Sequence, residues 1–439
     1  MERVARIKPF ANSTQMNILM FALDSMSHMS YQRMLPKTYA YLKHTLQAIT
    51  LDAYNIVGDA TTAAIIPIFT GQTEIELPET RVNKEGSHYV DIYPFIWNKF
   101  EQSGYVTLYA EDQPSLGTFQ LRLNGFEEPP VDHYMRPFWQ AALSSEIHEA
   151  SLQYCLGGKP EHQYTLDYMK DLFVKYPTVP KFAFGFIGEL SHADNNPAQY
   201  IDNDLKEFLE YLRVNGHLEN TLLIVMGDHG ARYSAVRQTT QGKLEERLPM
   251  MSFTFPEKFK MKYPHLITNL MRNKEQLSTP FDIHETLKTV LDIYNAEKPI
   301  RYSDRGISLL NSIPSNRTCA SAGIALHWCT CMQYEYLDVE EKKVKDIAEH
   351  VVSQLNDKLH PLTIETSPNN GLYEATIQAV VIEHSLSIVG DISRINRYGD
   401  QPHCILEKHP DLRKYCLCMK EPTPTPRRGY RKMKTSKKN

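Results

Sequence analysis

The sequence contains no long hydrophobic run. None of its apolar stretches approaches the about 18 residues that a membrane-spanning helix needs. The first residues, MERVARIKPFANSTQ, also lack the apolar core of a signal peptide. We therefore predict no transmembrane segment in this chain, and we find no leader sequence that would direct it to a particular compartment.

Cysteine is scarce before position 319 and frequent after it. Six of the seven cysteines form two late clusters, each ending in a Cys-x-Cys pair: Cys319, Cys329, Cys331, and Cys404, Cys416, Cys418. Mutual disulfides suit this spacing better than a zinc site, which usually uses Cys-x₂-Cys pairs. Sequons at Asn12 and Asn316 agree with a secreted glycoprotein. We expect an extracellular or secretory-lumen location, and we expect Met1 not to be the start of the complete protein.

Basic residues gather at the C-terminus. The net charge of the chain is −4, although residues 427–439 contain seven Lys and Arg and no acid. The remainder is therefore more acidic than the whole chain, and it has no basic stripe of the kind found in nucleic-acid-binding proteins. The tail follows Pro422, Pro424 and Pro426, so we predict that residues 421–439 are disordered.

Short apolar runs alternate with helical patterns along residues 1–314. The runs predict strands over residues 17–23, 51–57, 105–109, 182–187 and 222–226. Helical spacing is found between them, over residues 31–48, 89–102, 202–215 and 281–292. This alternation is typical of a doubly wound α/β fold with a mostly parallel sheet, which we assign to residues 1–314.

The sequence pattern changes near residue 315. A long charged helix is predicted over residues 337–359, followed by paired strands over 373–382 and 385–392. Together with the late cysteines, these elements predict a small disulfide-tied α+β appendage over residues 315–420.

Several predicted strands end in residues that can bind a metal or attack a substrate. In TLLIVMGDHGARY the strand runs into Asp228 and His229, and the strand over residues 17–23 ends at Asp24. One such end alone is equally well explained as a helix or turn cap. Ligands of open α/β sheets bind where the carboxyl ends of the strands meet. Taken together, Asp24, Asp228 and His229 predict a site for a divalent cation, with Thr61 as a hydroxyl nucleophile.

The order of these residues resembles the alkaline phosphatase/sulfatase superfamily, in which an αβα sandwich carries the site. Thr61 precedes a Thr-Gly pair by nine residues, as in the nucleotide pyrophosphatase-like branch. More closely, the chain resembles a family of mostly uncharacterised secreted animal proteins within that superfamily. The segments that carry this resemblance are DSMSHMSYQRMLPKTYAYL, YNIVGDATTAAIIPIFTG, GELSHAD, GDHGARY, LEERLPM, TCASAGIALHWCTC and DISRINRYG.

The resemblance implies roles for individual residues. Asp24, Asp228 and His229 match superfamily metal ligands, and Thr61 matches the nucleophile. The implied cofactor is one or two divalent ions, Zn, Mn or Mg. The implied substrate is a phosphate- or sulfate-bearing small molecule or glycan. The Cys-x-Pro-x-Arg turn of sulfatases is absent around Thr61, so phosphate is favoured over sulfate.

Further residues are candidates for a second metal or for substrate contact: Glu189, His192, His284 and Arg232. His192 falls where the superfamily places such a histidine. Gly188 stands where the phosphodiesterase-type pattern has an Asp, which leaves Glu189 as a weaker carboxylate and a single-metal site as open as a two-metal one. No motif supports His284. Arg232 and Lys243 are candidate anion-binding residues, with a surface position as the alternative.

Two positions beside the nucleophile depart from the related family. That family has the sequence Gly-Asp-Asn-Thr and a further Asn three residues after the Thr. In this chain Ala60 and Ala64 stand in place of the two Asn residues, and His28 replaces the usual Arg. An amide that stabilises an oxyanion contributes roughly 2.7–4 kcal/mol. The sequence therefore leaves two functions open, a metal-dependent phosphate-ester hydrolase or transferase and a secreted binding protein without catalysis.

Overall fold

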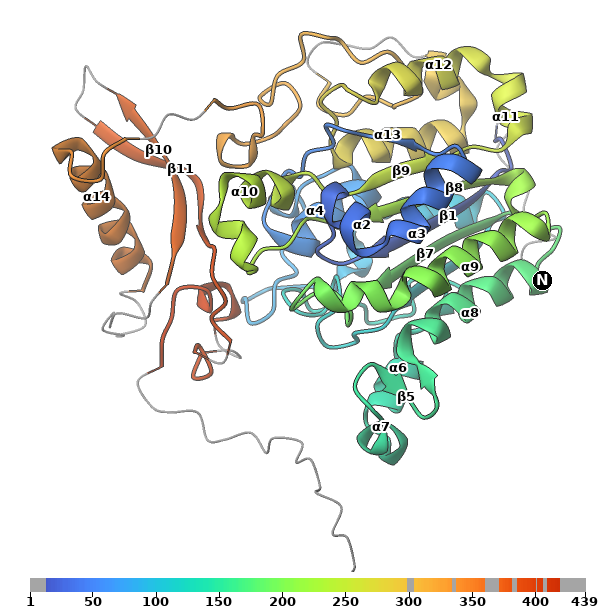
Figure 1. Cartoon of the computed structure of the whole chain (residues 1–439), viewed down its shortest axis with the longest axis horizontal. Helices are drawn as coiled ribbons and strands as arrows, with labels where there is room; N and C mark the ends of the chain where they lie inside the picture. Colours follow the sequence, from blue (N-terminus) through green and yellow to red (C-terminus); the bar gives the residue numbers. More distant parts are fainter. Residues whose placement is uncertain are drawn as a thin grey trace, which may run out of the picture.

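A seven-stranded sheet forms the centre of the protein (Figure 1). The computed structural model describes residues 13–297, 304–333, 337–359, 371–380, 385–399, 401–405 and 409–418. The strand order in the sheet is β2-β9-β8-β1-β7-β3-β4. These strands are β1 Asn17–Leu23, β2 Ile49–Thr50, β3 Val106–Glu111, β4 His133–Tyr134, β7 Lys181–Ile187, β8 Thr221–Gly227 and β9 Met251–Thr254.

Strand β1 lies between two parallel neighbours, β7 and β8. All seven of its residues are buried, because its NILMFAL sequence is covered on both faces. Leu23 is in register with both Ile187 and Gly227, so the three strands end at one level. The residues that follow these ends are therefore brought to a single edge of the sheet.

Helices cover both faces of the sheet, each over its own hydrophobic core. One core includes residues of α4 Ala60–Thr70, α5 Ile96–Gln102, α11 Glu257–Lys262, α12 Pro264–Asn273 and α13 Pro280–Leu291. The other includes residues of α2 His28–Met34, α6 Arg136–Leu143, α8 Glu161–Lys175 and α9 Asp202–Val214. This arrangement confirms the predicted doubly wound α/β fold.

Three predicted elements differ from the structure. The helix predicted over residues 89–102 is a 3₁₀ turn Val90–Ile92 followed, after Pro94, by α5. Residues 31–48 form α2, α3 Pro36–Ala40 and a π-helical turn Tyr41–Thr45, because Leu35 leaves the helical conformation before Pro36. The strand predicted over residues 51–57 is wrong. Backbone N–H groups there bond to carbonyls of separate segments, those of Met251, Lys274, Ser278 and Arg247, so the chain is extended without a continuous strand partner.

A second group of elements lies beside α10 Thr240–Arg247, at one side of the sheet (Figure 1). It contains α14 Lys342–Leu359 and the antiparallel strands β10 Tyr373–Val380 and β11 Ser385–Arg394. We call the described part of residues 342–418 the C-terminal hairpin unit. Its own core includes Leu355, Ile392, Ile405, Tyr415 and Cys416. Within the described residues, we find no helix with the length and apolar character of a membrane span.

The late cysteines pair within their clusters. Cys319 bonds to Cys329 and Cys404 to Cys418, which leaves Cys331 and Cys416 as thiols. The first disulfide packs against Ile56 and Leu277 of the α/β body. Asn316 is exposed, as a glycosylation site requires, whereas Asn12 and the predicted disordered tail lie outside the described residues.

Candidate active site

Three metal-capable side chains meet at the carboxyl ends of β1 and β8. One ligand atom from each of Asp24, Asp228 and His229 lies within 4.8 Å of the others. All three residues are buried, with 4%, 1% and 2% of their surfaces exposed. The structure thus brings together the residues that the strand-end pattern singled out.

The Asp228 side chain is fixed on one side and open on the other. Its Oδ1 accepts hydrogen bonds from the backbone N–H groups of Ser25, at 2.9 Å, and His229, at 2.8 Å. Its buried Oδ2 has no hydrogen-bond donor among the described residues. A buried carboxylate oxygen without a donor is costly, which makes a bound cation the natural partner for this atom.

Two glycines hold the Asp228-His229 pair in place through close backbone packing. A Cβ atom on Gly227 would lie 2.1 Å from the carbonyl oxygen of Met26. A Cβ atom on Gly230 would lie 2.1 Å from that of Glu245. Both distances are far below a van der Waals contact, so the packing around the site requires glycine at both positions.

The ring of His229 is oriented as a metal ligand. Its Nδ1 lies 2.8 Å from the carbonyl oxygen of Gly230, which assigns the ring proton to Nδ1 and leaves a lone pair on Nε2. That Nε2 lies 3.3 Å from Oδ2 of Asp228 and 3.8 Å from Oδ1 of Asp24. Tetrahedral zinc ligands at about 2.1 Å from the ion would lie roughly 3.4 Å apart, so the three donors fit one cation.

The charges of the two carboxylates support the same fit. Burial raises the pKa of Asp228, and the Asp24 carboxylate raises it further while His229 opposes both effects. Two buried carboxylates at this spacing repel each other, and a divalent cation between them would remove that repulsion.

Thr61 lies in the first turn of α4, with its hydroxyl toward His229. Its Oγ1 is 3.5 Å from Nε2 of His229. The N-cap residue Asp59 makes no side-chain cap, so the first-turn N–H groups of α4 are left for another acceptor. Ala60, directly before Thr61, has a φ of 68°, a left-handed conformation that Asn adopts more readily than Ala. The structure therefore places a hydroxyl and a helix N-terminus together beside the metal-type donors.

His192 joins the site from the loop after β7. Its Nδ1 lies 2.9 Å from Oδ2 of Asp24, and the Asp24 carboxylate raises the pKa of His192. Thr61 and His192 both line a cavity of about 200 Å³.

Arginines line the same cavity. Arg232, a predicted anion-binding candidate, is among them and also lies 3.0 Å from Asp59, while Arg122 holds the other oxygen of that carboxylate at 3.1 Å. Lys243, the other candidate, instead lies 2.9 Å from Glu374. Ala60 lines the cavity, whereas Ala64 is buried within α4 and is not among the lining residues described.

Two predicted candidates are not brought to this group. The Glu189 carboxylate is hydrogen-bonded by Gln113. His284 packs under Gly71, with its Nδ1 3.0 Å from the carbonyl oxygen of Ile68, and burial lowers its pKa to about 4. This histidine is thus a buried contact between α13 and α4, which is the helix-face alternative to a metal ligand.

Two buried acids at the end of β3 lie close to the site, although the sequence pattern gave them no defined role. Asp112 accepts N–H bonds from Gly188, at 2.8 Å, and Glu189, at 3.2 Å, and burial raises its pKa to about 8. Asp112 and Asp24 both approach Gly188. Burial also raises the pKa of Glu111 to about 7. The strand ending in Glu111-Asp112 was the available signal.

The fold and the site define an α/β protein with a metal-type Asp-Asp-His group beside a threonine hydroxyl at the strand ends. The chain belongs to the family described as "Protein of unknown function (DUF229)", whose sequence model matches residues 3–368. In the comparison with curated proteins, no protein matches.

Several solved structures have a similar fold. One is a protein of the alkaline phosphatase superfamily from Vibrio parahaemolyticus, with 13% identity over 68% of this chain and 77% of that chain, at a TM-score of 0.44. Another is the C-terminal periplasmic domain of EcEptC from Escherichia coli, with 12% identity over 71% and 92%, at 0.46. A third is the phosphonate monoester hydrolase SpPMH from Silicibacter pomeroyi, with 13% identity over 69% and 78%, at 0.45.

Proposed function

We propose that this protein is a metal-dependent hydrolase or transferase of phosphate esters, with Thr61 as its nucleophile. The observation that carries the proposal is the position of Thr61 Oγ1, 3.5 Å from Nε2 of His229 and beside Asp24 and Asp228. A divalent cation held by these three residues would lower the pKa of the Thr61 hydroxyl and offset charge on the phosphoryl group. Two disulfides support an extracellular or secretory-lumen location.

Residues of the chain would then carry out the separate steps of the reaction. The Thr61 hydroxyl loses its proton to solvent, its oxygen attacks phosphorus, the ester P–O bond breaks, and the alcohol leaves after taking a proton. We assign that proton to Nε2 of His192, because its Nδ1 is held by Asp24. The N–H groups at the start of α4 would bind phosphoryl oxygens. Attack by water or by an acceptor alcohol on the phosphothreonine returns Thr61 and completes hydrolysis or transfer.

Turnover of aryl phosphate, phosphodiester and aryl sulfate esters by the whole chain tests this proposal. We expect activity on a phosphate ester, and we expect Thr61→Ala and Asp228→Asn each to lower kcat by at least about a hundredfold. The exposed Thr268 provides a matched control, because Thr268→Ala leaves the site untouched. Near-normal turnover in Thr61→Ala would exclude the threonine mechanism.

A specific observation favours a second candidate, a secreted protein that keeps the fold and the metal but only binds its ligand. Ala60 lines the cavity beside Thr61 without an amide, at a position where the related family has Asn. Bound metal with no turnover in the same ester panel would support this candidate. Recovery of turnover in Ala60→Asn would then attribute the loss to the missing amide.

A further inference from the structure

The cavity over Thr61 is completed by the C-terminal hairpin unit. Arg397 and Arg413 line it together with Thr61 and His192, although they lie more than 300 positions after Thr61 and more than 200 after His192. Arg397 belongs to the DISRINRYG segment, to which the proposed mechanism gives no role. No acidic side chain is among the described residues that line this cavity.

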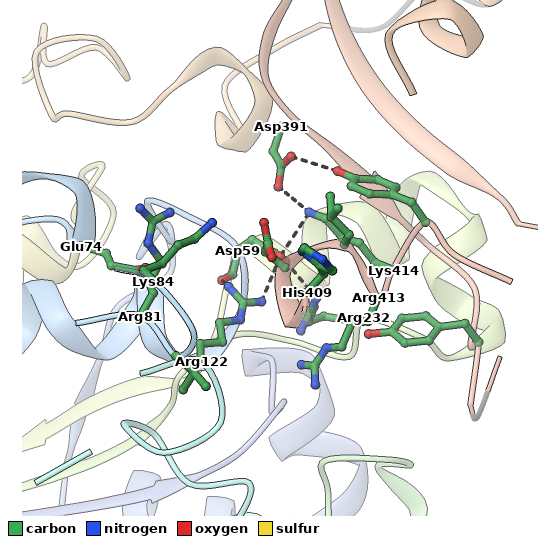
Figure 2. Close-up of a pocket in the computed structure, with 15 residues that line it drawn as sticks. Asp59, Glu74, Arg81, Lys84, Arg122, Arg232, Asp391, His409, Arg413 and Lys414 are labelled. Atoms are coloured by element: carbon green, nitrogen blue, oxygen red, sulfur yellow. Dashed lines mark hydrogen bonds and ion pairs between the residues drawn. The ribbon is translucent and has the colours of Figure 1, made fainter. Parts of the chain in front are cut away.

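A second, larger cavity lies between the α/β body and the hairpin unit (Figure 2). The larger cavity measures about 560 Å³ and is mainly lined by charged residues. Four residues line both cavities: Arg122, Arg232, Tyr398 and Arg413. The two cavities therefore adjoin at Arg413, a residue of the hairpin unit.

The arginines of the first cavity fall into two pairs. Arg122 and Arg232 are held by Asp59, and Lys414 of the hairpin unit lies 3.7 Å from the same carboxylate. Burial alone would raise the pKa of Asp59, but these three cations lower it well below its usual value. The charge of Asp59 is thus already balanced by Arg122, Arg232 and Lys414.

Arg397 and Arg413 have no such anchor. In the described parts of the chain, neither has an ion pair or a side-chain hydrogen bond, and Arg413 is half-buried. Other arginines of low exposure are paired, such as Arg237 with Glu246 and Arg317 with Asp282. A half-buried guanidinium without a counter-ion is unfavourable, so an anion from outside the chain is its natural partner.

We propose that Arg397 and Arg413 bind a second anionic group of the ligand, a phosphate or a sulfate, beyond the group that meets Thr61. The ligand then carries at least two separate anionic groups, as a multiply phosphorylated sugar or a multiply sulfated glycan does. The planar guanidinium suits either anion, because its N–H donors pair with two oxygens at once. This inference rests on the proposed function for the position of the first group.

Binding measured on the full-length Thr61→Ala protein tests the inference without turnover. Calorimetry would compare fructose 1,6-bisphosphate with fructose 6-phosphate, and a trisulfated with a monosulfated heparin disaccharide. We expect the more highly charged member of at least one pair to bind roughly tenfold to a hundredfold more tightly. The pair that shows the gain identifies the anion.

Substitution of the two arginines shows whether they cause the tighter binding of the more highly charged ligand. The double variant Arg397→Gln with Arg413→Gln should reduce the gain in affinity to about threefold or less. The ligand with a single phosphate or sulfate should keep its affinity. The exposed Arg272 on α12 is the matched control, and Arg272→Gln should retain the gain. The single Arg397→Gln variant changes an exposed residue and should fold normally. A partial loss of the affinity gain in this variant would show that the effect of the double variant is not caused by misfolding.

The outcomes separate this inference from the proposed function. A gain that the arginine variants lose supports the inference even if no ester is turned over. Equal binding of both members in both pairs overturns it, as does a gain that the double variant keeps. Turnover in the ester panel with no such gain would leave the mechanism standing and remove the second anion site.

Discussion

Oε1 of Glu374 lies 2.6 Å from Nη2 of Arg247, which joins the hairpin unit to the end of α10. Arg247 is fully buried, and its Nε and Nη1 have no hydrogen-bond acceptor among the described residues. Glu374 also bonds Arg237 and Lys243, whereas Arg237 has a second partner in Glu246. Arg247 thus depends on Glu374 more than the other two cations do.

Removing Glu374 should therefore be strongly destabilising. We expect Glu374→Ala to lower the free energy of unfolding by about 3–5 kcal/mol, because it leaves a buried guanidinium without its counter-ion. Urea denaturation measures the change. Glu219→Ala is the control, since Glu219 and Lys258 form an exposed pair at 3.9 Å that contributes about 0–1 kcal/mol. An equal, small loss in both variants would contradict the assigned role.

Ala60 stores backbone strain next to the nucleophile. Its φ of 68° costs an L-residue about 1–2 kcal/mol, whereas glycine adopts it freely. We expect Ala60→Gly to raise the free energy of unfolding by up to about 1 kcal/mol, after the entropy gained by the unfolded chain is subtracted.

The matched control for this prediction lies one helical turn further on. Ala64→Gly places the same substitution inside α4, where glycine is unfavourable, and should lower stability by about 1 kcal/mol. Thermal unfolding of the two variants would decide the matter. The same sign of change in both would show that Ala60 is not strained.

Asp112 should make stability depend on pH in metal-free protein. Burial raises its pKa to about 8, so between about pH 4 and pH 8 the folded state keeps a proton that the unfolded state has lost. The stability contributed by this group therefore falls as pH rises through that window. Asp112→Asn removes the effect, and its advantage over wild type should grow by at most about 1.4 kcal/mol per pH unit.

Urea denaturation in the presence of a chelator, at several pH values in that window, measures this difference. The exposed Asp167 is the control, because Asp167→Asn should follow the wild-type pH profile. If the Asp112→Asn curve also runs parallel to wild type, the Asp112 carboxyl is charged at neutral pH and the argument from burial fails.

The sequence was sufficient for features that depend on local pattern. Buried parallel strands are short apolar runs, so the ends of β1 and β8 could be located, and with them Asp24, Asp228 and His229. The two-sided α/β architecture then follows from the alternation of elements.

Contacts between distant segments were beyond a sequence pattern. The apolar run over residues 51–57 forms no strand because its backbone partners lie on four separate segments. His284 has the spacing of a helix-face residue, and only its contact with Ile68 shows that it is buried away from the metal-type group. Arg397 and Arg413 approach Thr61 through the docking of the hairpin unit, which no local periodicity encodes.

The metal content of the purified protein shows whether Asp24, Asp228 and His229 hold a divalent ion. After dialysis against metal-free buffer, elemental analysis should find at least one equivalent of a divalent ion in wild type. Asp228→Asn should bind that ion at least about tenfold more weakly, because it removes a buried, negatively charged ligand. Wild-type protein without a divalent metal, or Asp228→Asn with the same content and affinity, would contradict a metal site at Asp24, Asp228 and His229.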